Sequence, residues 1–146
     1  RSQMSPALAV GLDVRRPDLD YVLLRRRVAE WRTISKYYYG DYYPLTGYRT
    51  QDDVWMAWQY DCPEQGEGVV MAFRRPGSPY GSARFKLRGL DPAARYRVTN
   101  LDTSAAQEMT GAELSDQGLP VTLKRRPDSA LIVYKRVEST HSRKAP

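Results

Sequence analysis

Apolar residues recur along this chain with two different periods, and the first of them is helical. The acidic residues Asp18 and Asp20 precede the helical stretch, where a carboxylate can cap the backbone N–H groups of a first turn. From residue 21 to about residue 35, one apolar side chain falls on each turn: Tyr21, Leu24, Val28, Trp31 and Ile34. This spacing predicts an amphipathic helix with a single apolar stripe.

A short apolar run precedes the predicted helix. Residues 4–14 (MSPALAVGLDV) end this run at Asp13, which is typical of a buried strand. A strand followed by an amphipathic helix forms one β/α unit, and one such unit cannot cover its own apolar surfaces. The pair therefore requires the rest of a layered or barrel domain.

After Gly40 the pattern changes to the period of two that is typical of strands. Phe85 and Leu87, for example, alternate with basic residues at 84, 86 and 88, and turn-forming sequences such as PEQGEG and RRPGSPYGS separate the segments. Two segments, 54–60 and 131–134, are apolar on both faces and should be covered on both sides. Strands are predicted at 54–60, 69–74, 84–87, 95–100, 107–110, 121–124 and 131–135.

The predicted fold is mainly β, an antiparallel β-sandwich preceded by one β/α unit. Residues 1–36 hold the strand and the helix, and residues 37–50 form an aromatic junction. Residues 51–136 form the sandwich, and residues 137–146 are polar and basic, as in a flexible tail.

Aromatic residues concentrate between residues 37 and 60, which contain seven of the eleven tyrosines and two of the three tryptophans. Such rings suit packed junctions and sugar sites alike, because they bury a flat body and present a polar edge. Trp55 and Trp58 must face opposite sides of one strand. We expect one in the core and the other at a domain junction. In the alternative interpretation, Trp55, Tyr42 and Tyr43 contact a carbohydrate.

Composition limits the possible partners. A length of 146 residues with 41% hydrophobic residues suits one packed domain, and its apolar runs are strand-sized, so no membrane partner is expected. The net charge of +6 comes from basic residues spread along the chain. A solvated basic surface explains them better than nucleic-acid binding, which would require the arginines on one face.

Several kinds of chemistry are excluded by residue type. Cys62 is the single cysteine, which excludes a disulfide framework and a cysteine-based zinc site. His141 is the single histidine and lies in the predicted tail, so neither a Ser-His-Asp triad nor a histidine metal site is expected. No cofactor is predicted. One cysteine and no signal-peptide pattern at the start indicate a cytoplasmic protein, and a start at Arg1 indicates a piece of a longer one.

Carboxylates remain as candidates. Asp52 and Asp53 precede an apolar strand and are interpreted as a charged strand entry. Asp13 ends the first predicted strand, on the side where barrels place their active sites. We expect it to cap the backbone or to support active-site residues rather than to act directly.

Four successive stretches carry a family resemblance: WRTISKYYYGDYYPLTGY, DDVWMAWQYD, PEQGEGVVMAFRRPGSPY and ARFKLRGLDPAARYRVTNLD. Together they resemble the C-terminal end of glycoside hydrolase family 36, the α-galactosidase family. Residues 4–32 look like the last strand and helix of that family's (β/α)8 barrel, so residues 1–36 would be the end of a truncated barrel. Residues 111–136 are similar to the closing strands of its C-terminal sandwich, and the resemblance runs from about residue 4 to 136.

The resemblance implies a role without catalysis for this chain. Family members hydrolyse terminal α-galactosides with retention, using two aspartates. Both lie on barrel strands upstream of the part that this chain resembles, so no catalytic residue can be assigned here. The implied partners are the upstream barrel, a galacto-oligosaccharide substrate of the parent protein, and further copies in a homo-oligomer. The alternatives are an independent carbohydrate-binding module and, more weakly, a basic nucleic-acid-binding module.

Overall fold

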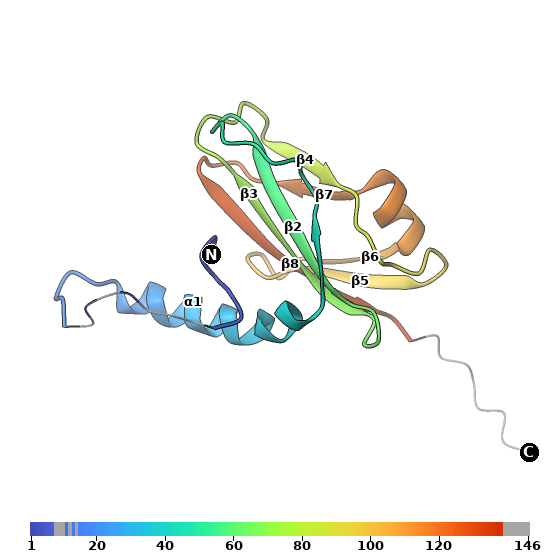
Figure 1. Ribbon diagram of the computed structural model, residues 1–146, viewed down its shortest axis with the longest axis horizontal. Coiled ribbons are helices and arrows are strands. Elements are labelled where there is room, and N and C mark those ends of the chain that lie inside the picture. Colours follow the sequence, from blue (N-terminus) through green and yellow to red (C-terminus); the bar gives the residue numbers. More distant parts are fainter. Residues whose placement is uncertain (8–10, 12, 14, 139–146) are drawn as a thin grey trace, which may run out of the picture.

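A computed structural model describes residues 1–7, 11, 13 and 15–138 (Figure 1). It begins with α-helix α1 (Tyr21–Ile34), which continues into the 3-10 helix η1 (Ser35–Tyr39). Eight strands and a π-helical turn, η2 (Glu113–Gln117), follow. The strands are β1 (Asp41–Pro44), β2 (Trp55–Cys62), β3 (Glu67–Arg74), β4 (Ser82–Phe85), β5 (Arg95–Asn100), β6 (Ala106–Thr110), β7 (Leu119–Thr122) and β8 (Asp128–Arg136).

The strands form two antiparallel sheets. The larger sheet has six strands in the order β1-β2-β3-β8-β5-β6, and β4 pairs with β7 in the smaller one. A buried core lies between the sheets and includes Val70, Phe85, Val98, Leu119 and Ile132. The predicted antiparallel sandwich is confirmed.

Both faces of β3 and β8, at the centre of the large sheet, are largely buried. The sequence predicts such cover for β8 and for β2, and the outer side chains of β2 are only partly buried. Alternate residues of β2, β3 and β8 point toward the small sheet, on what we call the inner face. The residues between them point to the outer face, where a second buried cluster joins Val69, Met71 and Leu131 to Ile34, Tyr37 and Tyr38. The sheet thus holds α1 and η1 as well as the small sheet.

Helix α1 has the bounds that its apolar period predicts. The side chain of Asp20 caps it, with Oδ1 accepting a hydrogen bond from the Leu23 N–H at 2.8 Å. Only Ile34 of the apolar stripe is buried. The reason is that only the C-terminal end of α1 lies against the sheet, whereas the helix extends away from the sheet toward Tyr21 (Figure 1). No helix among the described residues is long and apolar enough to span a membrane.

All seven predicted strands are present, and no end is shifted by more than three residues. The structure adds β1, inside the segment interpreted as a junction, and the turn η2. The described residues of the predicted strand at 4–14 form no strand, while residues 8–10, 12 and 14 lie outside the described part. His141 and most of the predicted tail also lie outside it.

The inner face contains a buried polar group, built around Tyr134. Its hydroxyl accepts a hydrogen bond from Gln59 Nε2 at 2.7 Å and donates one to Asp61 Oδ1 at 2.5 Å. Gln59 also bonds the backbone of Arg88, through Nε2 to the carbonyl oxygen at 2.8 Å and through Oε1 from the N–H at 2.9 Å. These bonds join β2, β8 and the segment after β4.

Gly68 makes room for the Tyr134 ring. The two residues are paired across β3 and β8, and a methyl group on Gly68 would overlap the tyrosine ring and hydroxyl. We expect Gly68→Ala to lower the free energy of unfolding by about 1–3 kcal/mol, because an overfilled core must shift its side chains. Urea denaturation measures this. Gly47→Ala is the control, since no atom lies within 4 Å of its added carbon, and equal effects at both positions would contradict the packing argument.

Candidate interdomain face

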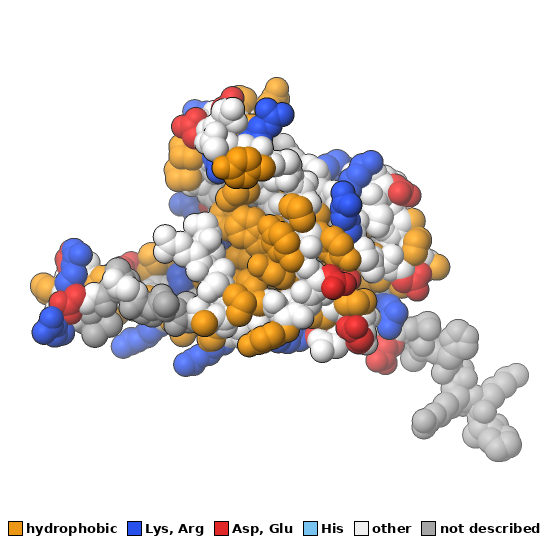
Figure 2. Space-filling model, in the orientation of Figure 1, with side chains coloured by type: hydrophobic (Ala, Val, Ile, Leu, Met, Phe, Trp, Pro, Cys, Tyr) orange, Lys and Arg blue, Asp and Glu red, His pale blue; other side chains and the backbone are white. Residues whose placement is uncertain are grey.

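The outer face of the large sheet carries an aromatic surface beside η1. The register of β1, β2 and β3 places Tyr42 opposite Tyr60, Pro44 opposite Trp58, and Met56 opposite Phe73. We call these six side chains the aromatic surface. Figure 2 shows hydrophobic side chains gathered over the region of β2 and β3 rather than scattered.

The rings of this surface pack against one another. Trp58 and Phe73 stack with centroids 4.9 Å apart, and Tyr42 lies 5.3 Å from Tyr60. Tyr38 of η1 meets Tyr60 edge to face at 4.9 Å. Tyr42 is nevertheless 55% exposed, and Trp58, Tyr60 and Phe73 are only partly buried. A contiguous apolar surface of this kind is a candidate interaction site.

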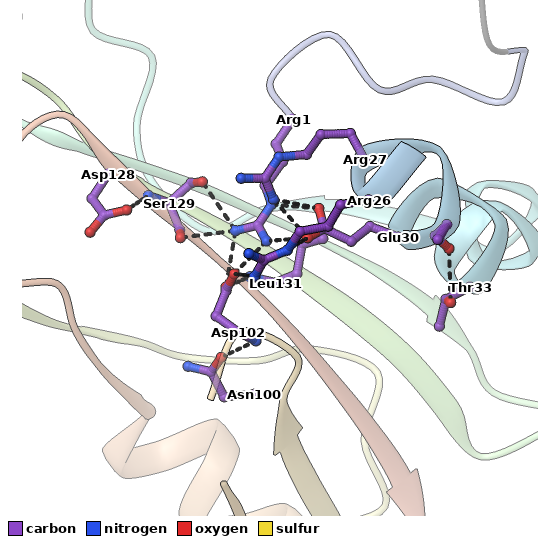
Figure 3. Close-up of polar contacts among 11 residues, drawn as sticks. Arg1, Arg26, Arg27, Glu30, Thr33, Asn100, Asp102, Asp128, Ser129 and Leu131 are labelled. Carbon is purple, nitrogen blue, oxygen red and sulfur yellow. Dashed lines mark hydrogen bonds and ion pairs between the residues drawn. The ribbon is translucent and has the colours of Figure 1, made fainter. Parts of the chain in front are cut away.

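A buried polar cluster fixes α1 to the sheet (Figure 3). The guanidinium of Arg1 bonds Glu30 of α1 through Nε at 3.0 Å and Nη2 at 2.9 Å. It also bonds Asp102 in the β5–β6 loop at 2.9 Å, and the carbonyl oxygen of Ser129 in β8 at 3.1 Å. We call these four residues the Arg1 cluster. Because the Arg1 side chain is only 4% exposed, these ion pairs are largely shielded from solvent.

The charge of Glu30 is stabilised by two arginines. Burial acts to raise the pKa of this carboxyl, but hydrogen bonds from Arg1 and Arg27 outweigh it, and the pKa falls to about 2. The Arg27 Nη1 lies 2.7 Å from the carboxylate. The contact between α1 and the sheet is therefore strongest when Glu30 is ionised.

The predicted site residues do not all come together. Trp55 lies on the inner side, where its Nε1 donates to the Tyr80 carbonyl oxygen at 3.0 Å and its ring lies 5.9 Å from Phe85. Trp58 packs in the outer cluster, so the two tryptophans do face opposite sides. Tyr43 faces inward beside Gly89. Asp13 is exposed and pairs with Arg15 at 2.9 Å, and hydrogen bonds from that arginine lower its pKa.

Tyr42 and Trp55 share one groove, which has a volume of about 310 Å³. The 93% exposed ring of Tyr48 stands in the loop that borders it. The Arg75 guanidinium holds this loop through the carbonyl oxygens of Arg49, at 3.0 Å, and Gln51, at 2.5 Å. Sequence reasoning missed Tyr48 as a groove residue, although it lies in the aromatic tract, because nothing local marks how the loop folds.

Two of the arginines that alternate with core residues lie on different sides of the sandwich. Phe85 of β4 and Leu87 just after it point into the core from one side, and Tyr96 and Val98 of β5 point into it from the other. Arg84 and Arg97, which alternate with these residues, therefore point to opposite sides of the sandwich. Within the described residues, no group of three His, Cys, Asp or Glu side chains could hold a metal ion.

Comparison with protein families identifies the chain. The model of the glycosyl hydrolase family 36 C-terminal domain matches residues 55–134, which are more than half of this chain. The chain belongs to this family. A comparison with curated proteins finds no match.

Solved structures of α-galactosidases have the same fold. The α-galactosidase AgaA of Geobacillus stearothermophilus, determined with raffinose, is 20% identical with a TM-score of 0.69, and the match covers 86% of this chain and 17% of AgaA. AgaB of the same organism is 23% identical with a TM-score of 0.63, covering 82% and 16%. The galactosidase domain of the α-galactosidase-sucrose kinase AgaSK is 19% identical with a TM-score of 0.64, covering 79% and 16%. This family 36 domain therefore spans about a sixth of these chains.

The Arg1 cluster makes the domain sensitive to acid. Because the folded-state pKa of Glu30 lies below its value in an unfolded chain, its stabilising effect is complete above about pH 4.5 and is lost as the pH falls toward 2. We expect Glu30→Gln to lower the free energy of unfolding by about 1–3 kcal/mol at neutral pH and to remove this dependence. Denaturation of both chains between pH 2 and 7 measures it.

The matched control is Glu108→Gln, which removes the exposed ion pair with Arg95. Exposed pairs contribute about 0–1 kcal/mol, so this variant should follow the unmodified chain. A Glu30→Gln variant with the same acid profile as the unmodified chain would show that the cluster does not hold α1.

Proposed function

We propose that this chain is a non-catalytic part of an α-galactosidase-like glycoside hydrolase, whose sandwich packs on the catalytic barrel and stabilises it. The observation that carries this proposal is the incompletely covered apolar surface that α1 shares with the outer face of the large sheet. The family match and the share of the relatives' length support it, because about five sixths of each relative lies outside the match.

The helix provides the first part of the contact. Leu24, Val28 and Trp31 of the apolar stripe are only half-buried, and Tyr21 is 40% exposed. An apolar stripe that the sheet of its own domain leaves uncovered is suited to pack against the rest of a barrel. The Arg1 cluster supports this role, since it fixes the angle at which α1 leaves the sandwich.

The aromatic surface provides the second part. It lies on the same face of the sheet as α1 and continues the buried cluster beneath η1. A barrel that packs along α1 would therefore reach Trp58 and Phe73 as well. In the proposed parent, hydrolysis of terminal α-galactosides with retention belongs to two barrel aspartates outside this chain. A galacto-oligosaccharide is then the parent's substrate, and a homo-oligomer is its proposed assembly.

A polar substitution on the stripe tests the barrel contact. In the parent protein, we expect Leu24→Gln to lower the temperature of thermal inactivation by several degrees, because a buried apolar contact of about 2 kcal/mol is lost. In the isolated chain, where Leu24 is half-buried, the effect should be smaller. Inactivation of α-galactosidase activity and unfolding of the isolated chain are the two measurements.

The control lies on the same helix. Val22 is 77% exposed and lies off the stripe. Val22→Gln should therefore change the free energy of unfolding by no more than about 0.5 kcal/mol, both in the parent and in the isolated chain. Equal effects of Leu24→Gln in the parent and in the isolated chain would contradict the proposed contact. The isolated chain should hydrolyse no aryl α-galactoside, and turnover by it would contradict its non-catalytic role.

A second candidate function is oligosaccharide binding in the groove beside Tyr42. The observation in its favour is a loop fixed by Arg75 that presents the exposed Tyr48 ring, because a preformed aromatic site loses little entropy on binding. Calorimetric titration with a galactose-containing oligosaccharide should give heat that Tyr48→Ala abolishes. Tyr39→Ala, which removes an 83% exposed ring outside the groove, should not change it. A titration without heat would end this candidate.

A further inference from the structure

Asp61 is a buried carboxyl with one oxygen left unpaired. It lies on the inner face of β2 and is 2% exposed. Oδ1 accepts the hydrogen bond from the Tyr134 hydroxyl at 2.5 Å, whereas Oδ2 is buried and has no hydrogen-bond partner. A buried polar atom without a partner is uncommon and costs free energy, and it costs more when the group is charged.

The surrounding segments close over this oxygen. Asp41 of β1 lies directly opposite Asp61 in the strand register. On the other side, the chain passes at Gly89, where an added carbon would lie 2.6 Å from Oδ2. Gly89 has a φ of +75°, a conformation that glycine adopts without strain. The segment at Gly89 therefore rests against the Asp61 carboxyl, and β1 pairs with the part of β2 that carries it.

The charges around Asp61 oppose its ionisation. Asp41 and Glu64 add negative potential, and no lysine or arginine of the described chain forms an ion pair with Asp61. Arg136 and Asp91 line an adjacent cavity of about 300 Å³ that Asp61 also borders. The remaining titratable or charged groups near this position are Tyr43, Cys62, Arg88, Tyr96 and Tyr134.

Burial has the largest effect on this carboxyl and raises its pKa. The hydrogen bond from Tyr134 acts in the opposite direction, and the charges of Asp41 and Glu64 raise the pKa further. The direction agrees with the geometry, because only the neutral carboxyl leaves no bare negative oxygen in the core.

We propose that Asp61 acts as a proton-controlled latch: its protonation state decides whether the end of the sandwich that adjoins the helices α1 and η1 stays closed. With a proton on its carboxyl, Asp61 lets β1 and the segment at Gly89 pack over it. When the proton leaves, the unpaired charge favours states in which this end opens to water. Because β1 begins two residues after η1 ends, the opening reaches the junction with the helices.

The sign of the pH dependence follows from the raised pKa. The stabilising effect of neutral Asp61 is complete below the pKa of an unfolded aspartate, about 3.9, and is lost as the pH rises toward the folded-state pKa. Within that window, each pH unit changes the closed-to-open ratio by about tenfold. Above it the loss is complete.

Two measurements on the full chain test the latch. The carboxyl carbon signal of Asp61, followed by NMR, should titrate clearly above the ordinary range of an aspartate. Hydrogen exchange of the β1–β2 amides, corrected for the intrinsic pH dependence, should accelerate by about tenfold per pH unit across the same window. An Asp61 that titrates at or below about pH 4 would overturn the proposal.

Asp61→Asn keeps the shape of the side chain and removes its charge, so hydrogen exchange of the β1–β2 amides should show no such acceleration in this variant. At pH values above the window, its denaturation midpoint should exceed that of the unmodified chain. Asp41→Asn on the exposed edge strand is the comparison variant: it keeps the buried carboxyl, so the acceleration should persist, but in a window moved to lower pH because one of the two opposing charges is gone. Acceleration that persists in Asp61→Asn would overturn the proposal. If that variant does not fold, the NMR titration of the unmodified chain decides.

Discussion

The whole domain depends on one constraint: the three central strands of the large sheet are apolar on both faces. Val69 and Met71 point one way, Val70 and Ala72 point the other, and all four are fully buried. A strand of this kind cannot stand at the surface of a two-layer sandwich, because one of its faces would meet water. The chain therefore needs a third layer, which α1 and η1 provide.

The third layer is incomplete, and this gives the domain its proposed role. Ile34, Tyr37 and Tyr38 bury the centre of the outer face, but α1 then leaves the sheet and its stripe loses cover. The same side chains cannot be both a complete core and a surface for a partner. What they leave exposed, on the helix and over β2 and β3, is the part of the layer that the proposed barrel would complete.

Local patterns predicted most of the fold, because strand and helix periods are local properties. The helix at Tyr21–Ile34 and the seven strands required no knowledge of tertiary contacts. β1 was missed because its DYYP sequence carries a proline, which usually argues against a strand; an edge strand tolerates it, and β1 lies at the edge. The Arg1 cluster was missed for another reason, since it joins residues about a hundred positions apart and no period records such a contact.

The same limit applied to the candidate site. Parity along β2 placed Trp55 and Trp58 on opposite faces, which holds. The alternation of side chains along a strand could not show that Tyr43 lies beside Gly89, or that Tyr48 belongs to a loop held by Arg75. It also gave no reason to expect a carboxyl in the core, because Asp61 ends a strand and reads as part of a polar turn.

The two carboxyls that matter most for this domain respond to pH in opposite directions. Glu30 stabilises the docking of α1 as an anion, so this contact weakens as the pH falls toward 2. Asp61 is best accommodated as a neutral acid, so the end of the sandwich weakens as the pH rises. The junction between helix and sandwich therefore has a stability maximum, limited at low pH by the paired carboxylate of Glu30 and at high pH by the unpaired carboxyl of Asp61. Glu30 lies on the outer side of the large sheet and Asp61 on the inner side, so the two carboxyls do not share contacts. A substitution at one of them should therefore move only the low-pH or only the high-pH limit of this stability maximum.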